Sequence, residues 1–253
     1  MKKEFVINPH TNQPSPASIG IIMLDTKFPR ITGDIGNPDS FDFPVQYEVV
    51  KGASPERIVL KADRAMIQPF IRAGRSLIEK GAKIVTTSCG FLALFQDELA
   101  QALGVPVFSS SLLQVHMAQA IIKKEQKVGI ITAHKTALTR NHLTAVGIEP
   151  ARVKIIGMEK SKEFSSVFLG GKQTLDEEKC RQEMHDTAKK LIEQNSYIGS
   201  IVLECTNMPP YAQTVRRATK GLPLFDMLTM INYAHSTLGC GRFFGSLIPI
   251  RHN

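Results

Sequence analysis

The chain has 253 residues, 43% of them hydrophobic and 21% charged, which is ordinary globular composition and enough chain for one large domain or two small ones. Its formal net charge of +8 comes from scattered Lys and Arg with no basic run interleaved with aromatic residues, so we expect no nucleic-acid partner. No run of apolar residues is long enough for a membrane span, so no membrane partner is expected. The N-terminus lacks the apolar core of a signal peptide, which predicts a cytoplasmic protein with reduced thiols.

Short apolar runs and helical patterns alternate along the first half. A buried strand is expected at residues 18–24, followed by a long Gly-, Pro- and Asp-rich loop at 25–44. Loops of that length in compact domains are often functional. The order then continues with a strand at 45–50, a helix at 63–80, a strand at 83–87, a helix at 92–103, a strand at 105–109 and a helix at 112–124.

The second half shows the same alternation. A Thr174/Glu177 capping-box pattern is expected to open one of its helices. In chain order the pattern predicts a strand at 127–132, a helix at 136–146, a strand at 153–157, a helix from the capping box to 194, a strand at 199–204, a helix at 211–220, a strand at 222–225 and a helix ending near 238. Short apolar strands alternating with helices predict an α/β fold with parallel sheets covered on both faces.

Two segments of the chain resemble each other. Each has an Ile-Val strand that runs into a cysteine, at Cys89 and at Cys205, and then a helix that ends before a Gly-x-Pro-apolar-Phe sequence. The step from Cys89 to Phe108 is 19 residues, and from Cys205 to Phe225 it is 20. Similarity in a fixed order predicts two related, Rossmann-like halves.

The two matched cysteines indicate chemistry. Ligands of open parallel sheets bind beyond the carboxyl ends of the strands, where both Cys89 and Cys205 fall. We expect the start of the following helix to lower the pKa of each thiol and to offer N–H groups to an oxyanion. If the halves face each other across a pseudo-dyad, one thiolate can remove a proton from Cα while the other thiol delivers one to the opposite face.

The remaining cysteines and histidines do not form a second site. Cys180 is expected on a helix face or the surface, and Cys240 in a tight turn. The seven histidines show no metal-ligand spacing, so no metal is expected. The sequence around Lys172 departs from the phosphate-loop pattern. Arg30 in the long loop is a candidate carboxylate clamp, and Glu204 could orient Thr206 or raise the pKa of Cys205.

At Ser88-Cys89-Gly90 and at Glu204-Cys205-Thr206-Asn207 the chain resembles the aspartate/glutamate/hydantoin racemase superfamily, which includes maleate isomerases and arylmalonate decarboxylases. The resemblance implies two Rossmann-like halves with the active site between them, no cofactor, a possible homodimer, and a last strand and helix that return to the first half. The implied division is residues 1–111 plus 226–253 for the half with Cys89, and 112–225 for the half with Cys205.

The resemblance also implies roles for individual residues. Cys89 and Cys205 match the catalytic thiols. The matching substrate-binding positions are Thr87, Ser88, Gly90, Thr132, Thr206 and Asn207. The chain departs from the family pattern where Gly90-Phe91 replaces Asn-Thr and where Glu204 replaces Gly, which bears on the substrate more than on the mechanism.

The sequence thus favours a cofactor-independent racemase or epimerase that acts on a small anionic carboxylate such as an amino acid. Two alternatives stay open at this point. One is a cis–trans isomerase or a decarboxylating lyase of a small dicarboxylate that uses the same pocket, and the other is a non-catalytic small-molecule binding protein.

Overall fold

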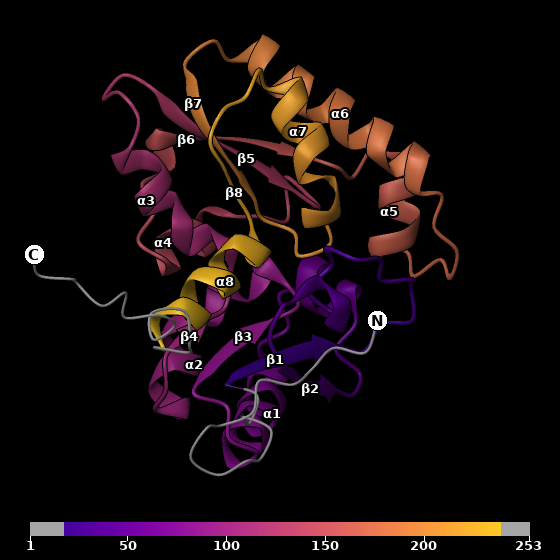
Figure 1. Cartoon of the computed structure of the whole chain (residues 1–253), viewed down its shortest axis with the longest axis vertical. Coiled ribbons are helices and arrows are strands. Elements are labelled where there is room, and N and C mark those ends of the chain that lie inside the picture. Colours follow the sequence, from indigo (N-terminus) through magenta and orange to yellow (C-terminus); the bar gives the residue numbers. More distant parts are fainter. Residues whose placement is uncertain (1–17, 239–253) are drawn as a thin grey trace, which may run out of the picture.

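The computed structural model describes residues 18–238, which form two four-stranded parallel sheets (Figure 1). Both sheets have the same strand order, second-first-third-fourth, so the two halves repeat one topology. The first sheet contains β1 (Ile19–Leu24), β2 (Val45–Val50), β3 (Ile84–Thr87) and β4 (Val107–Phe108). The second contains β5 (Lys127–Thr132), β6 (Val153–Gly157), β7 (Ile198–Leu203) and β8 (Leu224–Phe225).

Three of the central strands, β1, β3 and β7, are buried along their whole length because both faces of each sheet are covered. All side chains of β1, β3 and β7 are buried, whereas β2 at a sheet edge is mostly half-buried. In the first sheet Ile22 pairs with Thr87, so β1 and β3 end at about the same level. In the second, Ile131 pairs with Leu203 at the ends of β5 and β7. Each register brings the turn that follows the third strand to the carboxyl edge of its sheet.

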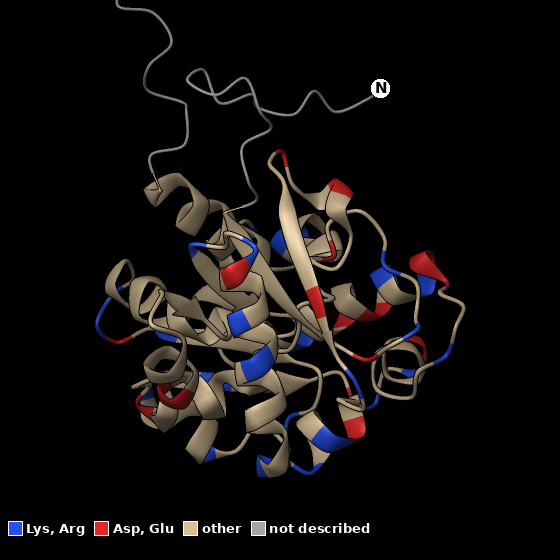
Figure 2. Ribbon diagram, turned by 90° about the horizontal axis from the view of Figure 1, so that it is seen from below, with Lys and Arg blue, Asp and Glu red and all other residues tan. Residues whose placement is uncertain are grey.

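Eight α-helices cover the described sheets: α1 (Ile67–Glu79), α2 (Gln96–Leu103), α3 (Val115–Ala120), α4 (Arg140–Ala145), α5 (Lys162–Phe168), α6 (Glu177–Gln194), α7 (Ala212–Ala218) and α8 (Met227–Thr237). None of the helices within residues 18–238 is long and apolar enough to cross a membrane. On the face seen in Figure 2, Lys and Arg are spread over several elements and interleaved with Asp and Glu.

Several expected elements differ from those observed. The helix expected at 92–103 begins as the 3-10 helix η4 (Gly90–Phe95), and the one expected at 112–124 ends as α3 at Ala120. The capping box was wrong, since Asp176 is the N-cap of α6 and accepts from the Lys179 N–H. The short helix α5 was not expected at all. Cys180 is not a surface thiol, because it is fully buried in α6; Cys240 lies outside the described residues.

The last helix packs against the sheet of the other half. Buried Met227, Met230, Ile231 and Ala234 of α8 join Ile19, Ile21 and Ile84 of the first sheet in one hydrophobic cluster. Conversely, α3 follows β4 and contacts β5 and β7 of the second sheet. The last strand does not return to the first half as the resemblance implied, because β8 pairs with β7. The division of the chain into two domains stays a prediction.

Candidate active site

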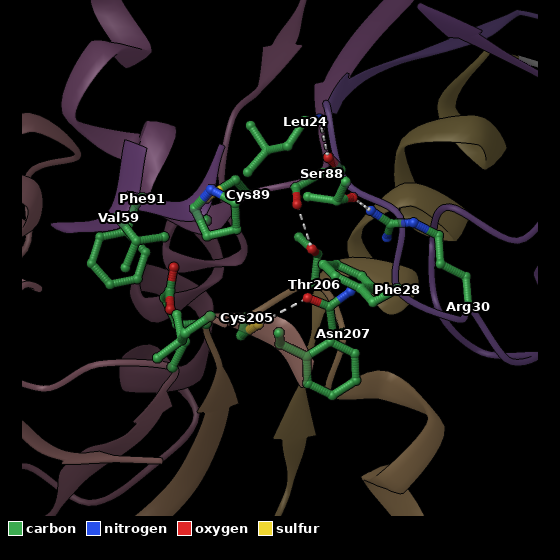
Figure 3. A pocket seen from close by; sticks show the side chains of 17 residues that line it. Leu24, Phe28, Arg30, Val59, Ser88, Cys89, Phe91, Cys205, Thr206 and Asn207 are labelled. Carbon is green, nitrogen blue, oxygen red and sulfur yellow. Dashed lines mark hydrogen bonds between the residues drawn. The ribbon is translucent and has the colours of Figure 1, made fainter. Parts of the chain in front are cut away.

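Both cysteines line one cavity between the two sheets (Figure 3). Cys89 follows β3 and has an extended backbone as the N-cap of η4, while Cys205 follows β7. The turns are joined directly, because the Thr206 hydroxyl donates a 2.7 Å hydrogen bond to the Ser88 carbonyl. Ser88 is held in turn by the Leu24 N–H, which donates to its hydroxyl at 2.9 Å. The geometry therefore places the two thiols on the walls of a shared site.

The structure separates the expected binding residues into two groups. Six of the eight expected site residues line the cavity: Ser88, Cys89, Gly90, Cys205, Thr206 and Asn207. The other two lie behind its wall. Thr87 donates its hydroxyl to the carbonyls of Cys89 and Ser109, and Thr132 donates to Glu204 Oε2 at 2.7 Å. The catalytic and substrate-binding roles of all eight stay predictions.

The long loop after β1 supplies a third part of the cavity through Thr26, Phe28 and Arg30. Arg30 donates to Asp34 at 2.8 Å and to the Thr26 hydroxyl at 2.9 Å. The other oxygen of Asp34, a buried residue, accepts from Asn207 Nδ2 at 2.6 Å. The loop is therefore tied to the second cysteine turn, and the Arg30 guanidinium already has a carboxylate partner in Asp34.

Aromatic side chains form much of the remaining wall. Phe28, Phe91 and Phe168 line the cavity, and the rings of Phe28 and Phe168 meet edge-to-face with centroids 5.1 Å apart. Phe168 comes from the end of α5 in the second half, so the wall is assembled from both halves. This wall was not predicted from the sequence, because no periodic pattern marks the loop that carries Phe28 or the seven-residue helix that carries Phe168.

The expectation of acidic thiols was wrong for this structure. Burial, followed by the nearby Glu204 carboxylate, raises the pKa of Cys89 to about 12. The N–H groups of Phe91 and Leu92 act in the opposite direction on the Cys89 pKa, but they do not outweigh burial. The same two causes, burial first and then Glu204, raise the pKa of Cys205 well above its ordinary value. The Cys205 thiol lies 3.5 Å from Asn207 Oδ1 and donates to it.

Glu204 is a fully buried acid on the cavity wall. One carboxyl oxygen accepts from Thr132, and the other, Oε1, has no hydrogen-bond partner among the described residues. Burial raises the pKa of Glu204 to about 7, although the hydrogen bonds from Thr132 and from the Ala133 N–H lower it. Gly90 packs against this acid so closely that a Cβ at position 90 would collide with Oε1 and with the Glu204 carbonyl.

The described residues contain no group of three or more His, Cys, Asp or Glu side chains placed to share a metal ion. The structure is therefore that of an α/β protein with two matching parallel sheets, each of which brings one cysteine to a common cavity. The chain belongs to the Asp/Glu/hydantoin racemase family, whose model matches residues 53–231, and it is an enzyme of that superfamily.

Several relatives are named as lyases. A dimethylsulfoniopropionate lyase of Durusdinium sp. clade D is 32% identical over 224 residues, which cover 86% of this chain and 73% of that protein. Dimethylsulfoniopropionate lyase 3 of Emiliania huxleyi (strain CCMP1516) is 31% identical over 90% of this chain. The chain spans only 61% of the length of that Emiliania protein.

Solved structures share the fold. An arylmalonate decarboxylase mutant matches 88% of this chain and 94% of its own with a TM-score of 0.58 and 18% identity. A glutamate racemase from Bacillus anthracis matches 88% of this chain and 81% of its own with a TM-score of 0.55 and 15% identity. The two-half architecture expected from the sequence is thus confirmed.

Proposed function

We propose that the chain is a cofactor-independent lyase that removes a β-leaving group from a small carboxylate, with dimethylsulfoniopropionate as its substrate. The observation that carries the proposal is a pair of thiols in one aromatic-lined cavity, in a chain 32% identical to a lyase named for that substrate. The sequence by itself favours a racemase over a lyase, and the similarity to named lyases reverses that order.

The chemistry needs a base next to Cα. Because the pKa values of both thiols are raised, the base is the small deprotonated fraction of one thiol of the Cys89/Cys205 pair, which the positive charge of the bound substrate increases. This thiolate removes a proton from Cα, and the C–H electron pair becomes the Cα–Cβ double bond. The Cβ–S bond breaks, and its electrons leave on sulfur as neutral dimethyl sulfide. Acrylate is the second product, and the abstracted proton passes from the thiol to water. The other thiol faces the same cavity and donates its S–H to the substrate carboxylate as negative charge develops there.

The surroundings of the thiols fit a substrate with both an anionic and a methylated cationic end. The N–H groups of Phe91 and Leu92 point toward the Cys89 thiol. The Ser88 hydroxyl accepts from the Leu24 N–H and can donate its own proton, so a carboxylate can be bound at this turn. Phe91 and Phe168 present aromatic surface to the cavity, and methylated cations bind well against aromatic faces.

Racemisation is the second candidate, because two thiols that line one cavity can also serve as acid and base on opposite faces of Cα. The two functions differ in their products. A lyase releases dimethyl sulfide and acrylate from dimethylsulfoniopropionate, whereas a racemase interconverts enantiomers of an amino acid and incorporates solvent deuterium at Cα.

The test follows dimethyl sulfide by gas chromatography and acrylate by NMR. In parallel, D- and L-aspartate, D- and L-glutamate and a hydantoin are incubated in D2O. We expect dimethyl sulfide and acrylate in equal amounts, and a loss of at least about 10³-fold in kcat/KM for Cys89→Ser and for Cys205→Ser. Cys180→Ala is the matched control, because Cys180 is buried in α6 and does not line the cavity. It is expected to retain the activity.

Two results would contradict the proposal. Enantiomer interconversion without dimethyl sulfide would assign the chain to the racemases. Full lyase activity in either serine variant would show that the thiol pair is not the catalytic machinery.

A further inference from the structure

The mechanism above makes no use of Glu204, an acid that lines the same cavity as the two thiols and raises the pKa of both. Glu204 is fully buried, and its Oε1 has no partner among residues 18–238. Removing a carboxylate oxygen from water without giving it a partner costs free energy of folding. An acid kept in such a place on the wall of a cavity indicates a partner that the protein itself does not supply.

The position of Glu204 is fixed from several sides. Its N–H donates to the Ile131 carbonyl at 2.8 Å, and its Oε2 accepts from Thr132 on the same strand, β5. Its carbonyl accepts from the Ser111 hydroxyl at 3.3 Å. On the opposite side Gly90 leaves room for Oε1 by lacking a side chain. The carboxylate is therefore held in one orientation.

The charges around the cavity leave this acid uncompensated. Arg30 and Glu204 are the only charged residues that line the cavity in the described part of the chain. Arg30 is paired with Asp34 and bonded to Thr26, so its charge is already balanced. Glu204 has neutral partners only. The excess charge on the cavity wall is thus negative, which suits a ligand with a positive group.

The neighbouring surface specifies the kind of cation. Phe91 follows Gly90 directly and lines the same cavity, as does Phe168. Phe28 lines it too, but the Arg30 guanidinium already lies over its ring, 4.7 Å from the centroid. Aromatic faces stabilise a cation without offering it a hydrogen-bond acceptor. An ammonium group could donate one N–H to Oε1, but its other N–H donors would face aromatic rings without a good acceptor. A methylated onium group has no N–H or O–H to place and meets the carboxylate through its charge alone, so this surface favours it.

We propose that Glu204 is the specificity-determining residue of the site, the counter-ion that selects zwitterionic carboxylates with a methylated sulfonium or ammonium group at Cβ. This inference rests on the proposed function and names its substrate class. When the Cβ–S bond breaks, the sulfonium becomes a neutral sulfide and its attraction to Glu204 is lost, which aids product release. Bound cation also offsets the carboxylate's unfavourable effect on the Cys89 and Cys205 thiolates.

Two isosteric ligands test the proposal without turnover. 3-(Trimethylammonio)propionate carries the cation, and 4,4-dimethylpentanoate replaces its nitrogen with carbon. Calorimetric titration of the wild-type protein is expected to give at least about tenfold tighter binding of the cationic ligand. Glu204→Gln is expected to remove most of that preference while the affinity for the neutral ligand changes less than about twofold. A preference retained in Glu204→Gln, or absent from the wild type, would overturn the proposal.

The pH dependence of the wild type gives a second test that needs no variant. Glu204 gains charge as the pH rises through about 7, so the cationic ligand is expected to bind more tightly at pH 8 than at pH 6. The raised pKa values keep the thiols of Cys89 and Cys205 protonated over this range, and buried His142, behind Phe91, stays neutral because its pKa is lowered to about 4.

The neutral isostere controls for the other charged groups near the site. Asp34 and Arg30 in the loop, and His134 and Lys135 after β5, would act through the carboxylate that both ligands share. An equal pH dependence of the two ligands would therefore overturn the proposal. Dimethyl sulfide release is measured separately. If the protein prefers the cationic ligand but releases no dimethyl sulfide, the lyase proposal is wrong and Glu204 remains the counter-ion. If dimethyl sulfide is released but Glu204→Gln keeps the preference for the cationic ligand, the lyase proposal stands and the role of Glu204 is wrong.

Discussion

At the scale of single residues, the site combines groups that the sequence marks with groups that it does not. The cysteines were found because two strands of a repeat end in the same residue type. Glu204 was expected either to orient Thr206 or to raise the pKa of Cys205, and it does raise that pKa. The sequence could not show that its carboxylate is buried and that Gly90 makes room for it. The direction of the thiol pKa was predicted wrongly for the same reason. The sequence shows that each cysteine precedes a helix start, which lowers a thiol pKa. It does not show the burial that raises the pKa more, because that burial depends on how the two halves of the chain pack together.

The buried acid should make stability depend on pH. The pKa of Glu204 is raised to about 7 in the folded chain, above its ordinary value of 4.5, so the folded state holds this proton more tightly than the unfolded state does. The associated stabilisation is complete below the unfolded pKa and is lost as the pH rises through about 7. Glu204→Gln cannot lose a proton. As the pH rises from 5 to 8, the unfolding free energy of the variant is therefore expected to increase by about 1–3 kcal/mol relative to that of the wild type.

Urea denaturation of both proteins at four pH values from 5 to 8 would measure this difference. Glu193→Gln is the matched control, because Glu193 is exposed on α6 and its only described ion pair is a 3.8 Å contact with Lys189. It is expected to follow the wild type at each pH. If the unfolding free energies of Glu204→Gln and wild type differ by the same amount at every pH from 5 to 8, Glu204 does not have a raised pKa in the folded protein.

At the scale of elements, strands were predicted better than helices. The runs at 45–50, 127–132 and 153–157 agree with β2, β5 and β6 to the residue, because a short run rich in Val and Ile has few alternatives where strands alternate with helices. Helix starts were harder, since η4 begins as a tight 3-10 turn around the cysteine. The short α5 was missed although Phe164, Val167 and Phe168 are buried, because seven residues give too little periodicity.

The loop between β1 and β2 is expected to act as a fixed wall of the site. Asp34 links Arg30 of the loop to Asn207 beside the second thiol, with distances of 2.8 and 2.6 Å. Asp34→Asn removes the charge that balances Arg30 and places an amide against the Asn207 amide. We expect a decrease of about 10- to 100-fold in kcat/KM for dimethyl sulfide release, mainly through KM, because orientation of the loop is lost.

Steady-state kinetics with Asp42→Asn as a control would test this link, since Asp42 lies in the same loop but is exposed. The control is expected to match the wild type. Unchanged kinetics in Asp34→Asn would mean that the loop does not need its contact with Asn207.

At the scale of the whole molecule, the repeat predicted the pairing of halves but not how they exchange helices. Matching strand orders explain why both thiols reach one cavity, since the carboxyl ends of parallel strands share an edge. The resemblance placed both the last strand and the last helix with the first half. Only α8 packs there, because β8 has a hydrogen-bonding partner in β7 while the apolar side of α8 is buried against β1 and β3.

Because α8 follows the second sheet but packs on the first, the two halves are expected to unfold together. α8 continues from β8 of the second sheet and buries Met230 to 2% and Ile231 to 1% exposure against the first sheet. Met230→Ala leaves a cavity at that junction and is expected to cost about 2–5 kcal/mol of unfolding free energy. Tyr233→Ala on the same helix is the control, because Tyr233 is 58% exposed, and it should cost less than about 1 kcal/mol.

Urea unfolding followed by circular dichroism and by the alkylation of Cys180, which is buried in the second half, should give the same shifted midpoint for Met230→Ala. A Cys180 midpoint that stayed at the wild-type value would show that the second half unfolds independently of the helix that joins it to the first.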